Sequence, residues 1–100
     1  ATRHVPLRVL RLLGRGRGRH ETGAGYEYLH VCVDDYSRLA YTELLPDERG
    51  TTVAAFLHRA ASSFAAHGIT ITRVLTDNGS GYISHTFAER CRQLQIKHSR

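Results

Sequence analysis

The residues of this chain that are best suited to chemistry lie around Asp77. An apolar stretch at residues 69–76 predicts a strand before Asp77, and Asn78 and Gly79 after it strongly favour a tight turn. An acidic residue at the end of a buried strand can point its carboxylate into a cleft above a sheet. The plainer alternative is that Asp77 only forms the turn by bonding its own backbone, and the local sequence leaves the two interpretations about even.

A second acidic pair, Asp34 and Asp35, also follows a predicted strand. Both residue types are common in turns, and either one can pair with Arg38 close by. A metal-binding role beside Asp77 is the alternative, because both acids end a strand of the same predicted sheet. We favour the structural role in the turn for Asp34, Asp35 and Arg38.

The basic residues gather near the start of the chain. The net charge is +5 with an isoelectric point of about 9.8, and a large part of the excess lies before Glu21, the first acidic residue. Residues 14–25 are rich in Gly and Arg, which predicts a flexible loop or an irregular hairpin connection. Arg15, Arg17 and Arg19 are therefore candidates for contacts with DNA phosphates, and a solvated loop is an equally good interpretation.

The composition sets broad limits on the class of protein. A chain of 100 residues with 41% hydrophobic residues can form one small soluble domain. It contains no apolar run long enough to cross a membrane and no secretory leader, so a cytoplasmic location is expected. Cys32 and Cys91 are too isolated for a zinc site or a disulfide framework and are expected to be core thiols. The histidines lack zinc-ligand spacing, and we assign them no role.

The hydrophobic pattern predicts how these residues are positioned. A helix with Thr51 or Thr52 as its N-cap and Gly68 at its end is the clearest element. A second helix is expected to begin at Ser84 or Thr86. Strands are predicted at residues 5–13, 28–33, 39–45 and 69–76, with a further extended stretch at 96–98, and the second and third are expected to pair as a hairpin. This order predicts an α/β fold in which helices flank a mixed sheet.

Two strings in this order resemble a known family. V-L-T-D-N-G-S-G-Y at residues 74–82 resembles the T-D-N-G-x-E-F stretch of DDE-type enzymes, namely retroviral-type integrases and bacterial insertion-sequence transposases. V-D-D-Y-S-R at residues 33–38 resembles the V-D-D-x-S-R strand and turn of the same family. Residues 26–100 are family-like and residues 1–25 match poorly, so we interpret residues 1–100 as a partial integrase catalytic core, incomplete at both ends. Gly81 departs from the motif and predicts a more flexible turn, whereas Tyr82 fills its aromatic position.

The resemblance implies a ribonuclease H-like fold and metal-dependent chemistry on DNA. In that family three carboxylates hold two ions, Mg²⁺ or Mn²⁺, about 4 Å apart, and these ions support strand cleavage and strand transfer. Asp77 matches the second carboxylate and is the predicted catalytic and metal-binding residue. Asn78 and Gly79 are expected to border the site and to lie near DNA.

The other two carboxylates of the family motif are not found in this chain. The first should fall within residues 5–13, where Val9 takes its place or where a truncated start or a shifted reading frame has removed it. The third is expected beyond Arg100. The prediction is therefore a DNA integration or transposition core, bacterial and nucleoid-associated, that is inactive as this fragment and oligomeric in the intact parent. The alternative is a non-catalytic nucleic-acid-binding remnant of a transposase; a true ribonuclease H would need more acids near Asp77.

Overall fold

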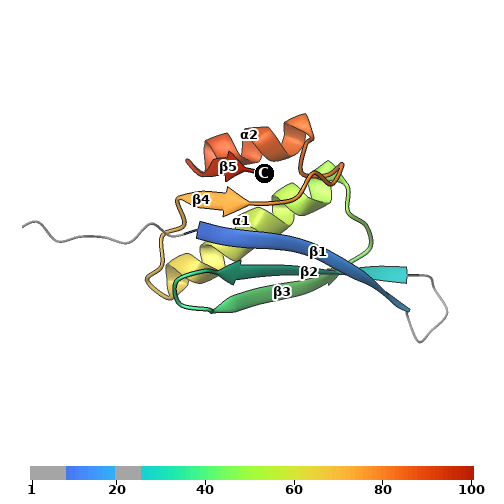
Figure 1. The fold of residues 1–100 in the computed structure, drawn as a ribbon, viewed down its shortest axis with the longest axis horizontal. Coiled ribbons are helices and arrows are strands. Elements are labelled where there is room, and N and C mark those ends of the chain that lie inside the picture. The colour runs from blue at the N-terminus through green and yellow to red at the C-terminus, as the bar shows by residue number, and fades with distance from the viewer. Residues whose placement is uncertain (1–8, 20–25) are drawn as a thin grey trace, which may run out of the picture.

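The computed structural model describes residues 9–19 and 26–100, which form one sheet and two helices (Figure 1). The helices are α1 (Gly50–Ala66) and α2 (His85–Gln93). The strands are β1 (Val9–Arg19), β2 (Tyr26–Asp34), β3 (Ala40–Leu45), β4 (Arg73–Leu75) and β5 (Lys97–Ser99). The predicted strand at residues 5–13 lies partly outside the described residues.

The five strands make a mixed sheet in the order β3-β2-β1-β4-β5. β1, β2 and β3 pair antiparallel, whereas β4 pairs parallel with both β1 and β5. This confirms the predicted α/β architecture and the predicted hairpin of the second and third strands. In the parallel half of the sheet, β1, β4 and β5 run in the same direction, so their carboxyl ends lie at the same edge.

Of the two predictions for residues 14–25, the flexible loop is wrong for residues 14–19, whereas the antiparallel pairing of β1 with β2, with its register shift, agrees with an irregular hairpin; residues 20–25 lie outside the described residues. Residues 14–19 continue β1, and Gly14, Arg15, Arg17, Gly18 and Arg19 all have partners on β2, with a register shift between Arg15 and Arg17. Glycine lowers the intrinsic preference for a strand, but the ladder with β2 provides hydrogen-bond partners for the backbone. The tertiary pairing outweighs the local composition.

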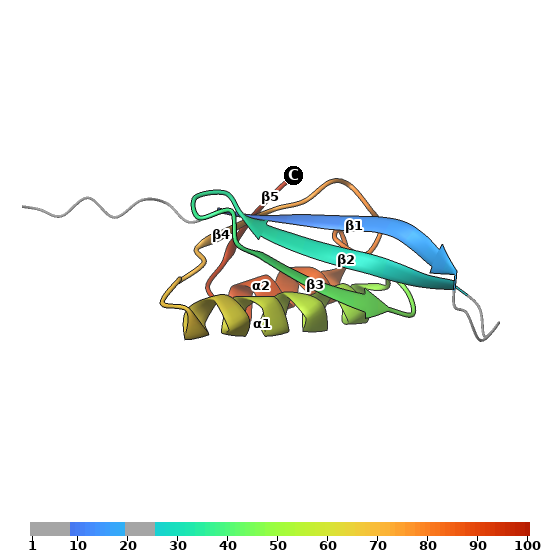
Figure 2. The same ribbon diagram turned by 90° about the horizontal axis from the view of Figure 1, so that it is seen from below.

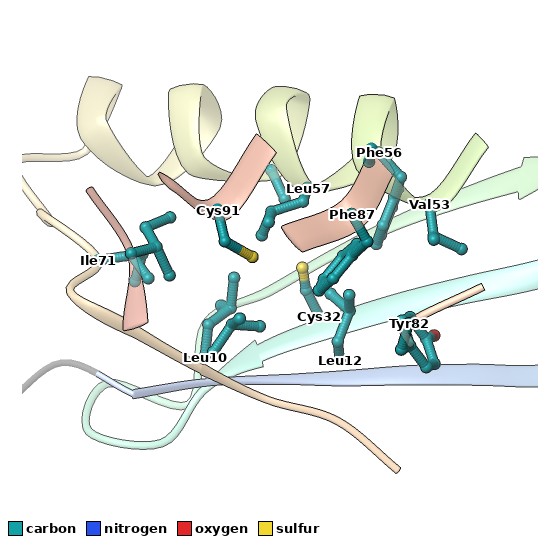
Figure 3. Packing of buried hydrophobic residues seen from close by; sticks show 14 of the residues in the cluster. Leu10, Leu12, Cys32, Val53, Phe56, Leu57, Ile71, Tyr82, Phe87 and Cys91 are labelled. Carbon is teal, nitrogen blue, oxygen red and sulfur yellow. The ribbon is translucent and has the colours of Figure 1, made fainter. Parts of the chain in front are cut away.

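Both helices cover one face of the sheet, as the view from below makes clear (Figure 2). Side chains from this face and from both helices form the core (Figure 3). Three phenylalanines, Phe56 and Phe64 of α1 and Phe87 of α2, are at most 1% exposed. Burial of side chains of this size is worth roughly 1.5–3 kcal/mol each before entropy is counted. This packing holds the helices against β1, β2 and β4.

The helix ends partly match the sequence-based expectations. Gly68 has a φ of 78°, which confirms the left-handed residue expected after α1. The expected N-caps Thr51 and Thr52 are wrong, because Arg49 occupies the N-cap position and makes no side-chain capping bond. For α2 the cap is Ser84, whose Oγ accepts a hydrogen bond from the Phe87 backbone N–H at 3.2 Å.

Cys32 and Cys91 are buried free cysteines, as the sequence predicted. Burial raises the pKa of the Cys91 thiol to about 11, and it also raises the pKa of Cys32. Both residues therefore pack as apolar side chains rather than as thiolates. Neither helix, the longer of which has 17 residues, is long and apolar enough to cross a membrane in the part of the chain that the structure describes.

Candidate functional site

Asp77 lies just beyond β4, in the parallel half of the sheet. Its neighbour Thr76 is buried and donates its backbone N–H to the Ser99 carbonyl at 3.0 Å, so the chain is held to β5 up to this point. Asp77 is exposed, and its Oδ1 accepts a hydrogen bond from the Gly79 backbone N–H at 2.7 Å. This bond uses one carboxylate oxygen, so forming the turn does not prevent Oδ2 from binding a ligand.

Asp77 lines two cavities. One, of about 250 Å³, lies between the start of α1 and the loop that follows Asp77. It is lined by Glu48, Val53, Asp77 and residues 79–82. The other, of about 260 Å³, lies on the β1 side and is lined by Arg11, Leu12, Leu75, Thr76 and Asp77. Asp77 thus stands at the border of two concave surfaces, which is the placement expected for a residue that meets a ligand.

The loop after Asp77 is tightly packed against the segment that precedes α1. Gly81 is buried, and a Cβ built on it would lie 2.3 Å from the Glu48 carbonyl oxygen. Ser84 Oγ donates to the Gly81 carbonyl at 2.7 Å, and the Tyr82 ring packs edge-on to Phe87 with centroids 5.5 Å apart. Gly81 therefore permits close approach of two backbones. Its departure from the motif has a reason in packing, and not in the flexibility that we expected. Tyr82 packs as predicted.

A histidine that we assigned no role contacts the strand end from the other side. The Nε2 of His98, on β5, lies 2.7 Å from the Thr76 hydroxyl, which in turn donates to the Asp77 carbonyl oxygen at 2.9 Å. When the hydroxyl proton is donated to Asp77, the His98 tautomer that carries its proton on Nε2 completes the chain by donating to Thr76. Burial, followed by the charge of Arg100, lowers the pKa of His98 below its usual value and favours the neutral ring. The alternation of side chains along the extended stretch at residues 96–98 is the sequence signal that could have indicated that His98 shares the inner face with Ile96.

The structure also shows which β1 residues approach Asp77. Val9 pairs with Arg73, which precedes Asp77 by four residues in the chain. The β1 residues at the cavity beside Asp77 are Arg11 and Leu12, and neither carries a carboxylate. On this register the Val9 backbone lies opposite Arg73, and the placement of the first acid of the motif at Val9 stays a prediction.

Asp34 and Asp35 occupy the β2–β3 turn and line neither of the cavities beside Asp77. Asp34 is fully buried, and its Oδ2 accepts from Ser37 N at 3.0 Å and from Ser37 Oγ at 2.6 Å. Its carbonyl accepts from the backbone N–H of Arg38, whose φ is 65°. Asp35 forms an ion pair with Arg11 of β1 at 2.9 Å, rather than the expected pair with Arg38. The two acids and Arg38 therefore build the turn and tie it to β1.

The predicted DNA-proximal residues divide into two groups. Asn78 and Gly79 are exposed next to Asp77, and Gly79 lines the first cavity. Arg15, Arg17 and Arg19 are placed in β1 by their backbones, but their side chains lie outside the described part of the structure. The structure thus brings Asn78 and Gly79 to the site and leaves the arginine contacts as a prediction.

The residues present do not complete a metal site of the kind that the motif implies. Within residues 9–19 and 26–100, no three His, Cys, Asp or Glu side chains gather where they could hold one ion. Hard cations such as Mg²⁺ take several oxygen ligands, and Asp77 supplies one carboxylate. This part of the chain can contribute a ligand but does not enclose an ion.

Comparison with known proteins finds relatives among retroviral polyproteins. The chain is 35% identical over 72 residues to the Gag-Pro-Pol polyproteins of Mason-Pfizer monkey virus and simian retrovirus SRV-1, which covers 72% of this chain and 4% of each polyprotein. It is 31% identical over 72 residues to the Pol-related polyprotein of the mouse intracisternal A-particle MIA14, covering 72% of this chain and 8% of that protein. The chain thus spans less than a tenth of the length of these relatives.

The family model of the integrase core domain matches residues 16–100 and so extends into the basic segment. The mixed five-stranded sheet with two helices is a ribonuclease H-like α/β fold. Together, the fold, the placement of Asp77 and this match show that the chain belongs to the integrase core domain family.

Proposed function

We propose that this chain is the part of a DNA-integrating polynucleotidyl transferase that supplies Asp77, one of the carboxylates of its catalytic site. The observation that carries the proposal is the position of Asp77. It follows the central parallel strand β4, borders both cavities, and keeps Oδ2 outside the turn bond. Integrase core domains use divalent ions, and Asp77 is the described residue best placed to bind one.

We further propose that the 100-residue chain does not cleave or join DNA by itself. The β1 residues beside Asp77 are Arg11 and Leu12, so no second carboxylate is supplied from that strand. A divalent ion bound through one carboxylate keeps most of its water ligands and is held weakly. Binding of Mg²⁺ or Mn²⁺ at Asp77 is therefore expected to be weak, and turnover is expected to need acids from outside the described residues.

The test compares Mn²⁺ binding by the wild-type chain, Asp77→Asn and the control Glu89→Gln. Asn keeps an oxygen that can accept from the Gly79 N–H, so the turn is preserved. Glu89 is an exposed carboxylate on α2, away from both cavities. Paramagnetic broadening of the amide signals of residues 77–79 is expected in the wild type and in Glu89→Gln and should vanish in Asp77→Asn. Equal broadening in all three proteins would remove Asp77 from the metal site.

A plasmid-nicking assay with Mg²⁺ or Mn²⁺ tests the second part of the proposal. No nicking above a buffer control is expected from the wild type. Metal-dependent nicking that Asp77→Asn abolishes would show that the chain is active by itself and would overturn the proposed inactivity. Both proteins are given the same DNA substrate, so the wild type and Asp77→Asn are directly comparable.

A non-catalytic nucleic-acid-binding module is the second candidate function. The net charge of +5 favours it, as does the position of Arg11 at the cavity beside Asp77. A protein that binds DNA phosphates releases the counterions condensed on the DNA, so its affinity falls steeply as the salt concentration rises. The absence of salt-sensitive binding to DNA at low ionic strength would exclude this function.

A further inference from the structure

His98 of β5 lies on the helix-covered side of the sheet, beside the strand end that carries Asp77. Side chains alternate along an extended chain, so Val74 and Thr76 share one face. Val74 is fully buried, Thr76 is 6% exposed, and His98 is the ladder partner of Val74. The His98 ring packs against Phe87 of α2, with centroids 5.0 Å apart and planes at 70°. The helix thus holds the ring beside the Thr76 side chain.

The Thr76 hydroxyl makes two contacts but has one proton to donate. Its Oγ1 lies 2.9 Å from the Asp77 carbonyl oxygen and 2.7 Å from His98 Nε2. A carbonyl oxygen can only accept, so both contacts are hydrogen bonds only when the His98 ring carries a proton on Nε2. Burial, followed by the charge of Arg100, lowers the pKa of His98 and favours the neutral ring, which has a single N–H.

These two bonds act on the peptide group that follows Asp77. A peptide unit is planar, so a bond to the Asp77 carbonyl orients the whole group that leads into the turn. Two residues further on, the Gly79 backbone N–H donates to Asp77 Oδ1 at 2.7 Å. A chain of bonds therefore runs from His98 through Thr76 and the turn to the carboxylate itself.

The far end of the same loop is held by aromatic rings. The Tyr82 backbone N–H donates to the Gly79 carbonyl at 3.0 Å, and the Tyr82 ring packs against Phe87 with centroids 5.5 Å apart. Phe87 is also the ring that contacts His98. His98 is therefore linked to both ends of the loop, by hydrogen bonds at Thr76 and by ring contacts at Tyr82.

We infer that His98 is a positioning residue that fixes the carboxylate of Asp77 through the Thr76 hydroxyl, with its ring proton on Nε2. The inference rests on the proposed function, because it bears on catalysis only where Asp77 is a site residue. A packing role would need only the shape of the His98 ring, whereas this role needs its N–H.

The experiment uses NMR to measure exchange of the Gly79 amide hydrogen with solvent, on the full chain without metal or DNA. His98→Phe keeps a ring against Phe87 and removes the N–H. Thr76→Val keeps the branched shape and removes the hydroxyl, whereas Thr76→Ser keeps the hydroxyl. Exchange at Gly79 is expected to be about two- to tenfold faster in His98→Phe and Thr76→Val, the effect of one hydrogen bond. It is expected to stay near the wild-type rate in Thr76→Ser.

A double variant shows whether His98 acts through Thr76. In the Thr76→Val background, His98→Phe is expected to change Gly79 exchange no further, because the hydroxyl that links them is already gone. The matched control is His67→Phe, which removes an exposed histidine after α1 whose Nδ1 lies 2.9 Å from the Ser63 carbonyl oxygen. This control is expected to exchange Gly79 at the wild-type rate. Additive effects of His98→Phe and Thr76→Val would overturn the path through Thr76.

The ring nitrogens of His98 test the inference in the wild-type protein, so this result does not depend on how a variant folds. Long-range ¹H–¹⁵N spectra distinguish the two neutral tautomers, and the form with its proton on Nε2 is expected. A proton on Nδ1 would make His98 the acceptor of the Thr76 proton. The bond from Thr76 to Asp77 would then be absent, and the inference would be overturned.

Two further outcomes separate this inference from the proposed function. Leu57 is fully buried in α1, so its amide hydrogen reports opening of the whole fold. Faster exchange at Leu57 in His98→Phe, with Gly79 unchanged, would mean that His98 only stabilises the fold and would overturn the inference alone. Mn²⁺ broadening that persists in Asp77→Asn would instead overturn the proposed function, and the catalytic meaning of His98 with it, even where Gly79 exchange rises as expected.

Discussion

Replacing Gly81 with alanine tests whether close backbone packing holds the loop that carries Asp77. The new Cβ would lie 2.3 Å from the Glu48 carbonyl oxygen and 3.2 Å from Val53 Cγ2. Ordinary contacts begin at about 3.4 Å, so the two segments must separate by about 1 Å. A backbone carbonyl cannot rotate away as the end of a side chain can. The strain must therefore be relieved by moving the loop or the start of α1.

The expected cost follows from overpacking in a well-packed region, which typically costs about 1–3 kcal/mol. For a domain of this size, 1 kcal/mol shifts the melting temperature by roughly 4–8 °C. A loss of about 2 kcal/mol predicts a melting temperature roughly 8–16 °C below wild type. Thermal melts followed by circular dichroism measure the melting temperature, and urea titrations measure the free energy of unfolding. An unchanged urea m-value would show that the variant exposes as much surface on unfolding as the wild type.

Gly68 provides the matched control, because its constraint is conformational. It has a φ of 78° and nothing within 4 Å of a built Cβ, so Gly68→Ala should cost about 1–2 kcal/mol from backbone strain. Gly68→Asn should recover part of this, since Asn tolerates the left-handed region, whereas Gly81→Asn should be worse than Gly81→Ala. A Gly81→Ala protein that melts within about 2 °C of wild type would refute the packing argument.

Three further predictions concern side-chain bonds. Glu43→Gln should lower the free energy of unfolding by about 1 kcal/mol, because Glu43 accepts two hydrogen bonds at 2.8 Å from the partly exposed Arg59. These bonds lower the pKa of Glu43. The difference in stability between wild type and variant should therefore be present above about pH 4.5 and disappear in denaturation curves measured at lower pH. Wild type should lose stability as the pH falls below about 6.5, because the folded state lowers the pKa of His98 and the unfolded chain therefore binds the proton first. His98→Gln should lack this loss. The same dependence of the free energy of unfolding on pH in both proteins would contradict the prediction. Ser84→Ala should cost about 1 kcal/mol by removing the α2 cap, and an unchanged urea midpoint would contradict that role.

The sequence by itself determined most of the local structure and the candidate residue. The alternating apolar pattern predicts β2 and β3 closely, and the helical spacing predicts α1, whose N-cap lies two or three residues earlier than expected. The pair Asn78 and Gly79 marks the turn after β4, so the sequence alone is enough to single out Asp77. These features depend on neighbours in the chain, which is why local patterns reveal them.

Only the tertiary structure decided which distant residues meet. The strand conformation of residues 14–19 depends on the ladder with β2, and the small size of Gly81 matters because Glu48 happens to lie against it. The contact of Thr76 with His98 comes from the register of β4 with β5. Register is set by packing across the whole sheet, and a shift of one residue would reverse every face, so no local pattern could have predicted these contacts.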